Sequence, residues 1–304
     1  MMKQIPYGIT DFSRIQKENY YYVDKTMFIE KIEMQPPYLF LIRPRRFGKS
    51  LTLAMLEAYY DVNHAEQFDE LFGQLYIGQH PTKLHNQFLI MRFNFSVVSS
   101  FVYEVERSFK LHCSSKLKDF VYKYEHLFGK EIWNVLDESI QGDPGAFLSA
   151  INTYASRKGN LRIYLLIDEY DNFTNTILST YGTEFYRKAT HGEGFIRGFF
   201  NVIKSATTGT GAALERLFIT GVSPVTMDDV TSGFNIGTNI TNDSWFNDLV
   251  GFSENELREM LEYYKEQGVL QESIDEIVAM MKPNYDNYCF SEDTLEQCMF
   301  NSDM

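Results

Sequence analysis

Four short apolar runs, separated by stretches with helical periodicity, constrain the fold of this chain more than any other feature. They lie at residues 38–42, 88–95, 162–167 and 217–219. Because apolar residues stand at mostly consecutive positions, both faces of each strand are expected to be covered, as in a parallel sheet. Parallel strands need long crossover connections, and the intervening stretches suit helices. The sequence therefore predicts an α/β, three-layer fold with a mostly parallel sheet.

The helical stretches lie at residues 51–60, 102–128 and 193–203, and the C-terminal part differs from them. Ser253 and Glu256 have the spacing of a capping box, which predicts a helix start there. A second helix is expected over residues 272–281, ended by Pro283. We therefore divide the chain into a larger α/β domain, residues 1–250, and a small helical lid-like appendage, residues 251–304.

Charge and cysteine content exclude several classes of protein. The 304 residues include 28 Lys and Arg against 41 Asp and Glu, a formal net charge of −13. This balance disfavours direct nucleic-acid binding by this chain alone. No run of about 18 apolar residues predicts a membrane span, and residues 1–11 lack the apolar core of a secretory signal. Cys113, Cys289 and Cys298 form no CxxC or zinc pattern, so we expect neither a disulfide scaffold nor a zinc module, and a cytoplasmic setting.

The first apolar run leads into residues 43–50, RPRRFGKS, and then into a helix. The phosphate-loop pattern is GxxxxGK[ST], so Gly48, Lys49 and Ser50 fit it, whereas Arg43 replaces the first glycine. Free N–H groups and the helix dipole attract phosphate at such a place. Lys49 would reach the β- and γ-phosphates, and Ser50 would bind Mg²⁺. The alternative is a solvated basic turn.

A wider set of residues is expected to contact the nucleotide. It comprises Arg45, Arg46, Phe47, Gly48, Lys49, Ser50, Leu51 and Thr220. Four cations within seven residues of an acidic chain favour an anionic ligand at this loop. Thr220 ends the fourth apolar run, where a polar side chain could contact the γ-phosphate. It could equally be a threonine that simply ends a strand.

The third apolar run ends in Asp168 and Glu169. Asp168 would hold Mg²⁺ through water, and Glu169 would polarise the attacking water as a general base. Glu169 and Lys49 are therefore the catalytic candidates. The alternative is an acidic turn that caps a strand, which is also a sufficient explanation of Asp171.

These residues together resemble a bacterial family of predicted AAA-ATPase-like proteins, P-loop NTPases near the archaeal-type ATPases. The resembling segments are residues 21–26, 43–50, 166–171, 218–224, 232–236 and 246–249, and the resemblance extends over about residues 5–290. It implies an ATPase core with the acidic pair on the third strand and Arg at position 43 as a habit of the family. Asp24 is suggested as a base contact through its family position alone.

The resemblance also implies a difference at the C-terminus. Members usually continue into a domain that resembles PD-(D/E)xK nucleases, whereas the match here stops near residue 301 after a modified segment at 284–291. We therefore expect a truncated chain with no nuclease activity of its own. We also expect Phe290, Met299 and Phe300 to be poorly covered, giving a frayed tail or self-association.

Two functions follow from the sequence. The first is Mg²⁺-ATP binding with slow ATP hydrolysis that drives or gates a conformational step. The alternative is a nucleotide-gated interaction or regulatory module without significant turnover, linked to a separate or lost nuclease domain. ATP and Mg²⁺ are the expected ligands, and a protein partner or a second copy of the chain is the expected macromolecular partner.

Overall fold

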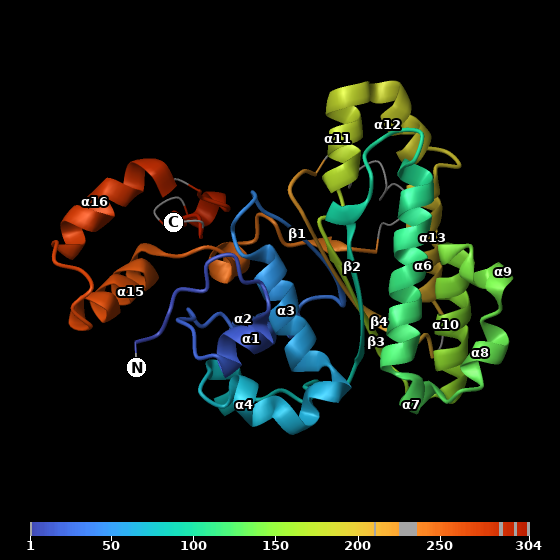
Figure 1. Ribbon diagram of the computed structural model, residues 1–304, viewed down its shortest axis with the longest axis horizontal. Coiled ribbons are helices and arrows are strands. Elements are labelled where there is room, and N and C mark those ends of the chain that lie inside the picture. The colour runs from blue at the N-terminus through green and yellow to red at the C-terminus, as the bar shows by residue number, and fades with distance from the viewer. Residues whose placement is uncertain (1, 210, 225–235, 286–287, 295–296, 303–304) are drawn as a thin grey trace.

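A five-stranded sheet lies at the centre of the computed structural model, which describes residues 2–209, 211–224, 236–285, 288–294 and 297–302 (Figure 1). The strands are β1 (Tyr38–Ile42), β2 (Leu89–Asn94), β3 (Ile163–Asp168), β4 (Leu214–Gly221) and β5 (Thr238–Asn239). Their order is β2-β3-β4-β1-β5, and every neighbouring pair is parallel. The predicted α/β fold with a parallel sheet is confirmed, and β5 is the strand that the apolar runs did not show.

Alternate residues of the strands enter two separate cores, as the pleat of a strand requires. In β1, Leu39 and Leu41 lie in one core and Phe40 and Ile42 in the other. Both cores are closed by helices, which confirms the three-layer arrangement (Figure 1). One layer comprises α6 (Val105–Lys123), α10 (Pro144–Lys158) and α13 (Phe195–Ala206); the other comprises α1 (Phe12–Lys17), α2 (Phe28–Met34) and α3 (Lys49–Tyr60).

Shorter elements connect these strands and helices in the part of the chain that the structure describes. They are α4 (Phe68–Phe72), α5 (Tyr76–Gln79), α7 (Glu125–Phe128), α8 (Ile132–Val135), α9 (Glu138–Gln141), α11 (Asn172–Tyr181), α12 (Thr183–Thr190) and the 3₁₀ turns η1 (Val62–Gln67), η2 (Phe95–Val97), η3 (Ser244–Leu249) and η4 (Glu292–Thr294). The helix expected over residues 102–128 is therefore split into α6 and α7. Among the residues that the structure describes, no helix is long and apolar enough to cross a membrane.

Two helices, α15 (Glu254–Glu266) and α16 (Ile274–Tyr285), form the C-terminal part. The capping box of Ser253 and Glu256 at the start of α15 is present as predicted. The expectation that Pro283 ends the second helix is wrong, because α16 continues through it to Tyr285. Pro283 lies in the last turn of α16, where it has no N–H to donate to the carbonyl of Ala279, four residues earlier.

The apolar residues near the C-terminus that the structure describes are covered rather than exposed. Met299 and Phe300 are fully buried, and Phe290 packs partly buried against the core beside β1. Phe252 and Phe300 form an isolated β-bridge, so the expectation of poorly covered apolar groups is wrong. A disulfide joins Cys289 and Cys298, which the cysteine spacing did not lead us to expect. Of the segments that carried the family resemblance, residues 232–235 and 286–287 lie outside the described residues.

Gly221, the last residue of β4, lies against the turn that follows β3. A Cβ atom at this position would overlap the ring of Tyr170 and the carboxylate of Asp171. We expect Gly221→Ala to lower the free energy of unfolding by about 1–3 kcal/mol, the usual cost of overpacking. Urea unfolding measures the change.

Gly198 provides the matched control, because a Cβ atom at this exposed helical position meets nothing within 4 Å. Gly198→Ala should stabilise the protein by about 0.5–1 kcal/mol, since alanine is the better helix former. If both substitutions changed the free energy of unfolding in the same direction, the close packing inferred at Gly221 would be contradicted.

Candidate functional site

The loop between β1 and α3 has the backbone shape of an anion-binding turn. Gly48 caps the N-terminus of α3 in the left-handed conformation, with φ of 85°. Arg46 also has a positive φ, of 66°, which is uncommon for a residue with a Cβ atom. The unpaired N–H groups and the dipole of a helix N-terminus attract negative charge. The predicted strand–loop–helix setting of Gly48, Lys49 and Ser50 is therefore present.

Lys49 is buried and bonds to the loop itself. Its Nζ donates to the carbonyl oxygens of Arg43 at 3.0 Å and Pro44 at 2.8 Å. Burial lowers the pKa of Lys49, although the nearby Asp168 and Glu169 carboxylates act in the opposite direction. A buried ammonium group without a bound anion is costly, so this position favours a negatively charged ligand.

Asp168 joins three segments that are far apart in the sequence. Its Oδ2 accepts a 2.6 Å hydrogen bond from Ser50 Oγ, and its Oδ1 accepts a 2.8 Å bond from Thr220 Oγ1. Asp168 and Thr220 are both fully buried. Since β4 lies between β1 and β3, the sheet order itself brings these three side chains together. Three of the residues selected from the sequence thus form one hydrogen-bonded group.

The oxygen atoms of Ser50 and Asp168 are of the kind that Mg²⁺ prefers. Within the described residues, no group of three or more His, Cys, Asp or Glu side chains is arranged to hold a metal ion. One hydroxyl and one carboxylate do fit the habit of Mg²⁺, which takes few protein ligands and completes its shell with water and substrate phosphates. These residues therefore fit a metal that enters together with a nucleotide.

Glu169 and Asp171 have different environments in the turn after β3. Glu169 is half-buried, with φ of 50°, and its Oε2 accepts a 2.8 Å bond from Asn172 Nδ2. Asp171 is fully buried and accepts bonds from the backbone N–H groups of Val222 and Ser223. Asp171 thus fastens this turn to the segment after β4, whereas Glu169 lies at the edge of the candidate site.

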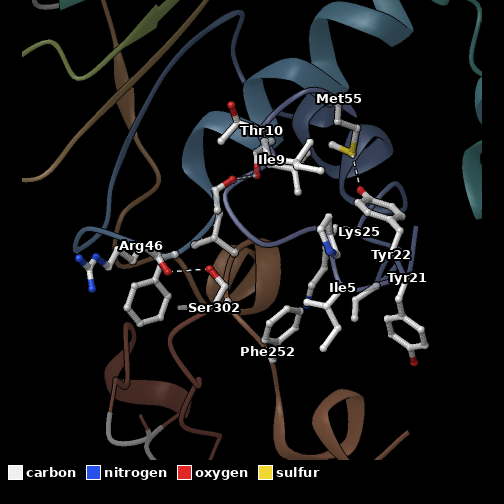
Figure 2. Close-up of a pocket in the computed structure, with 18 of the residues that line it drawn as sticks. Ile5, Ile9, Thr10, Tyr21, Tyr22, Lys25, Arg46, Met55, Phe252 and Ser302 are labelled. Carbon is white, nitrogen blue, oxygen red and sulfur yellow. Dashed lines mark hydrogen bonds between the residues drawn. The ribbon is translucent and has the colours of Figure 1, made fainter. Parts of the chain in front are cut away.

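Arg43 does not face the ligand position. It therefore cannot be counted among the four clustered cations that were expected to attract an anionic ligand. Its buried guanidinium donates to the carbonyls of Thr241 and Phe246, the latter at 3.1 Å, and lies 4.0 Å from the centre of the Phe290 ring. Burial lowers the pKa of Arg43 to about 10. Arg43 is not among the residues with positive φ, so the missing glycine imposes no left-handed strain there. Arg45 is exposed, and the exposed side chain of Arg46 extends away from the other labelled residues (Figure 2).

A cavity of about 280 Å³ adjoins the loop (Figure 2). It is lined by residues 5–10, Tyr21, Tyr22, Val23, Lys25, Arg46, Phe47, Gly48, Leu51, Thr52, Met55, residues 249–252, Met260 and Ser302. The lining is largely apolar, and its size is near the lower end for small-molecule pockets, about 300–1,000 Å³. Four residues selected from the sequence line it: Arg46, Phe47, Gly48 and Leu51.

Lys25 lines the cavity, whereas its neighbour Asp24 was the residue selected from the sequence. Its Nζ donates to Glu256 Oε1 of α15 at 2.6 Å, which links the cavity to the C-terminal helices. Asp24, suggested as a base contact, instead accepts bonds from Thr26 and from the backbone of Tyr76. It closes a turn and does not line the cavity. The signal that could have found Lys25 was the resemblance of residues 21–26.

Comparison with known proteins identifies the family of the chain. Residues 6–231 match the family model described as Predicted AAA-ATPase. The chain belongs to this family. A curated relative described as an uncharacterized protein in the vnfD 5′ region of Azotobacter chroococcum mcd 1 is 28% identical over 260 residues. The match covers 84% of this chain and 44% of that relative, so the chain spans less than half of the relative's length. No solved structure matches the chain.

Arg43 offers a test of its inferred structural role in this AAA-ATPase-like chain. Arg43→Gly restores the usual phosphate-loop glycine but leaves the partly buried carbonyl of Thr241 and the buried carbonyl of Phe246 without the guanidinium donor. We expect a loss of about 1–3 kcal/mol in unfolding free energy for each unpaired carbonyl, measured by denaturant unfolding.

The exposed Arg45 is the control, and Arg45→Ala should change stability by no more than about 0.5 kcal/mol. A fully stable Arg43→Gly variant would refute the anchoring role of Arg43.

Proposed function

We propose that this chain binds Mg²⁺-ATP at the phosphate loop and hydrolyses it slowly, and that this step drives or gates a conformational change. The observation that carries the proposal is the hydrogen-bonded group of Ser50, Asp168 and Thr220 beside the buried Lys49. It places a cation, a hydroxyl and a carboxylate at the N-terminus of a helix that follows a buried strand. Membership of the predicted AAA-ATPase family supports the same ligand.

In this proposal, each residue of the site has one role in ATP binding or hydrolysis. The N–H groups at the start of α3 and the Lys49 ammonium bind the phosphates, Lys49 leaving the carbonyls of Arg43 and Pro44. Ser50, and Asp168 through water, would hold Mg²⁺, and the ion would supply positive charge against the charge that develops on the phosphate. Thr220 lies next to Asp168, where it can contact the terminal phosphate. Glu169 orients and deprotonates the attacking water once it leaves Asn172.

We place the nucleobase in the apolar cavity beside the loop. The cavity shares Phe47, Gly48 and Leu51 with the loop and the start of α3, so a ligand can occupy both at once. Apolar side chains such as Ile9, Met55 and Phe252 suit the faces of a purine ring. The division into residues 1–250 and a lid-like part, residues 251–304, belongs to this proposal, since α15 supplies Met260 to the cavity lining and its Glu256 accepts a hydrogen bond from Lys25.

One observation favours the alternative, a nucleotide-gated interaction or regulatory module without turnover. The Glu169 carboxylate is bonded to Asn172 within its own turn, and this bond holds it away from the role of a base. Such a module would act on a protein partner, a second copy or a separate nuclease domain. The net charge of −13 still disfavours direct binding of nucleic acid by this chain alone.

Lys49→Ala tests the binding step. Loss of the charge-assisted contact should weaken ATP binding by about 1.5–3 kcal/mol, which is tenfold or more in Kd. Titration of ATP with and without Mg²⁺ measures this, and Lys118→Ala, at an exposed position of α6, serves as the control. Unchanged ATP affinity in a folded Lys49→Ala variant would refute the site.

Glu169→Gln separates the ATPase from the binding module. The amide keeps the shape of the side chain but is no base, so phosphate release should fall by about 10²–10⁴-fold while ATP binding persists. Asp168→Asn should instead weaken the Mg²⁺-dependent part of both binding and turnover. Equal turnover in the wild type and Glu169→Gln would remove the catalytic role of Glu169.

A further inference from the structure

We propose that the C-terminal tail, described residues 288–294 and 297–302, is a positioning element of the nucleotide site that holds the phosphate loop in its anion-binding shape. This inference rests on the proposed function, because it concerns the loop to which we assign the phosphates. The tail is about 250 residues away from the loop in sequence, yet Ser302 lines the cavity beside it (Figure 2).

Three successive carbonyl groups of the loop accept hydrogen bonds from the C-terminal part of the chain. The Arg46 carbonyl accepts from Ser302 twice, from its N–H at 3.1 Å and from its Oγ at 2.6 Å. The Arg45 carbonyl accepts a 3.4 Å bond from Asn301 Nδ2, and the Phe47 carbonyl a 3.0 Å bond from the Gly251 N–H. Residues 45–47 of the loop are therefore held on their carbonyl side.

The rigidity of the peptide group makes these bonds relevant to ligand binding. Each peptide unit is planar, so the carbonyl of one residue fixes the direction of the N–H of the next residue. Bonds to the carbonyls of residues 45–47 thus orient the N–H groups of residues 46–48. These N–H groups belong to the turn that would surround a phosphate, and orientation before binding removes part of the entropic cost of binding.

Aromatic packing fixes the tail on the same loop. The buried ring of Phe47 contacts Tyr288 and Phe290 edge to face, with ring centres 4.8 Å and 5.3 Å apart. Phe290 also lies under the guanidinium of Arg43, at 4.0 Å. The tail therefore contacts both ends of the loop with its side chains and the middle of the loop with its hydrogen bonds.

The tail is itself closed into one unit. The disulfide between Cys289 and Cys298 joins its two halves, and the Met299 N–H donates to the Tyr288 carbonyl at 3.1 Å. Because Phe300 also bridges to Phe252, the tail is continuous with the segment that supplies Gly251. Binding at the loop and docking of the tail must then favour each other equally, as linkage requires.

Ser302 gives the sharpest test, because one atom can be removed without disturbing the aromatic contacts. Ser302→Ala loses the Oγ bond to Arg46, and Ser302→Thr keeps a hydroxyl. Thr294→Ala is the matched control, since the Thr294 hydroxyl donates to Ser291 within the tail and not to the loop. Three quantities are measured for each variant: affinity for ATP and for inorganic tripolyphosphate, hydrogen exchange of amides 43–49 without ligand, and unfolding free energy.

The expected result is specific to Ser302→Ala. Its affinity for both ATP and tripolyphosphate should fall by up to about tenfold, because binding must then order a loop that this hydrogen bond no longer holds. Its loop amides should exchange faster, while the unfolding free energy stays close to that of the wild type. Ser302→Thr and Thr294→Ala should resemble the wild type in all three measurements.

Other outcomes overturn the inference in distinguishable ways. Unchanged affinity and loop exchange in Ser302→Ala would refute the tail proposal and leave ATP binding intact. Equal losses in Ser302→Ala and Thr294→Ala would show general loosening of the tail, which also refutes it. A wild type that binds neither ATP nor tripolyphosphate would refute the proposed function, and the exchange of the ligand-free loop would still decide whether the tail positions it.

Discussion

The Asp168 carboxylate, bonded to Ser50 on one oxygen and Thr220 on the other, is the interaction on which the candidate site depends. A fully buried carboxylate without donors would cost several kcal/mol. The two hydroxyls offset this cost, and they come from the segments that follow β1 and end β4. The same bonds therefore keep the phosphate loop, the acidic strand and the neighbouring strand in register before any ligand arrives. A hydroxyl can donate its proton to a carboxylate and offer an oxygen lone pair to a metal at the same time, so the bond from Ser50 to Asp168 is compatible with a metal that binds Ser50 and reaches Asp168 through water.

In the phosphate loop, the backbone carbonyl groups and the backbone N–H groups have different partners. Its carbonyls are engaged by Lys49, Gly251, Asn301 and Ser302, and these bonds stabilise the loop without using the N–H side. The Lys49 ammonium group is buried, and both of its described hydrogen bonds go to neutral carbonyl groups. An incoming anion would therefore change the electrostatic environment of Lys49 more than that of the other loop residues. Burial lowers the pKa of Lys49, and the negative charge of a bound phosphate would act in the opposite direction by favouring the protonated form. The hydrogen bonds to its carbonyls thus stabilise the loop without a ligand, and a negatively charged ligand would stabilise the buried Lys49 ammonium further.

The parts of the site that could be predicted from sequence share one physical cause. Strand ends in a parallel sheet converge on one edge, so Ser50, Asp168 and Thr220 could be placed together from apolar runs and the residues that end them. Arg43 could not be placed in this way, because a count of charges does not show where a side chain points. The tail and the cavity could not be predicted either, since they depend on contacts between the N-terminal residues, the loop and segments beyond residue 249. Such contacts leave no periodic pattern in the sequence, and the nine-residue spacing of Cys289 and Cys298 is equally uninformative.

Arginine at the first glycine position of the loop becomes understandable once the tail is considered with it. Glycine is required where a backbone needs positive φ or where a Cβ atom would meet a neighbour. Here the positive φ values fall on Arg46 and Gly48, so position 43 is open to a side chain. A long cation at that position reaches the carbonyls of Thr241 and Phe246 and the ring of Phe290. In a chain without the tail, the same arginine would lose the Phe290 contact, and its buried charge would be more costly. Arg43 and the tail therefore form one structural unit, in which the departure from the glycine pattern and the covering of the loop explain each other.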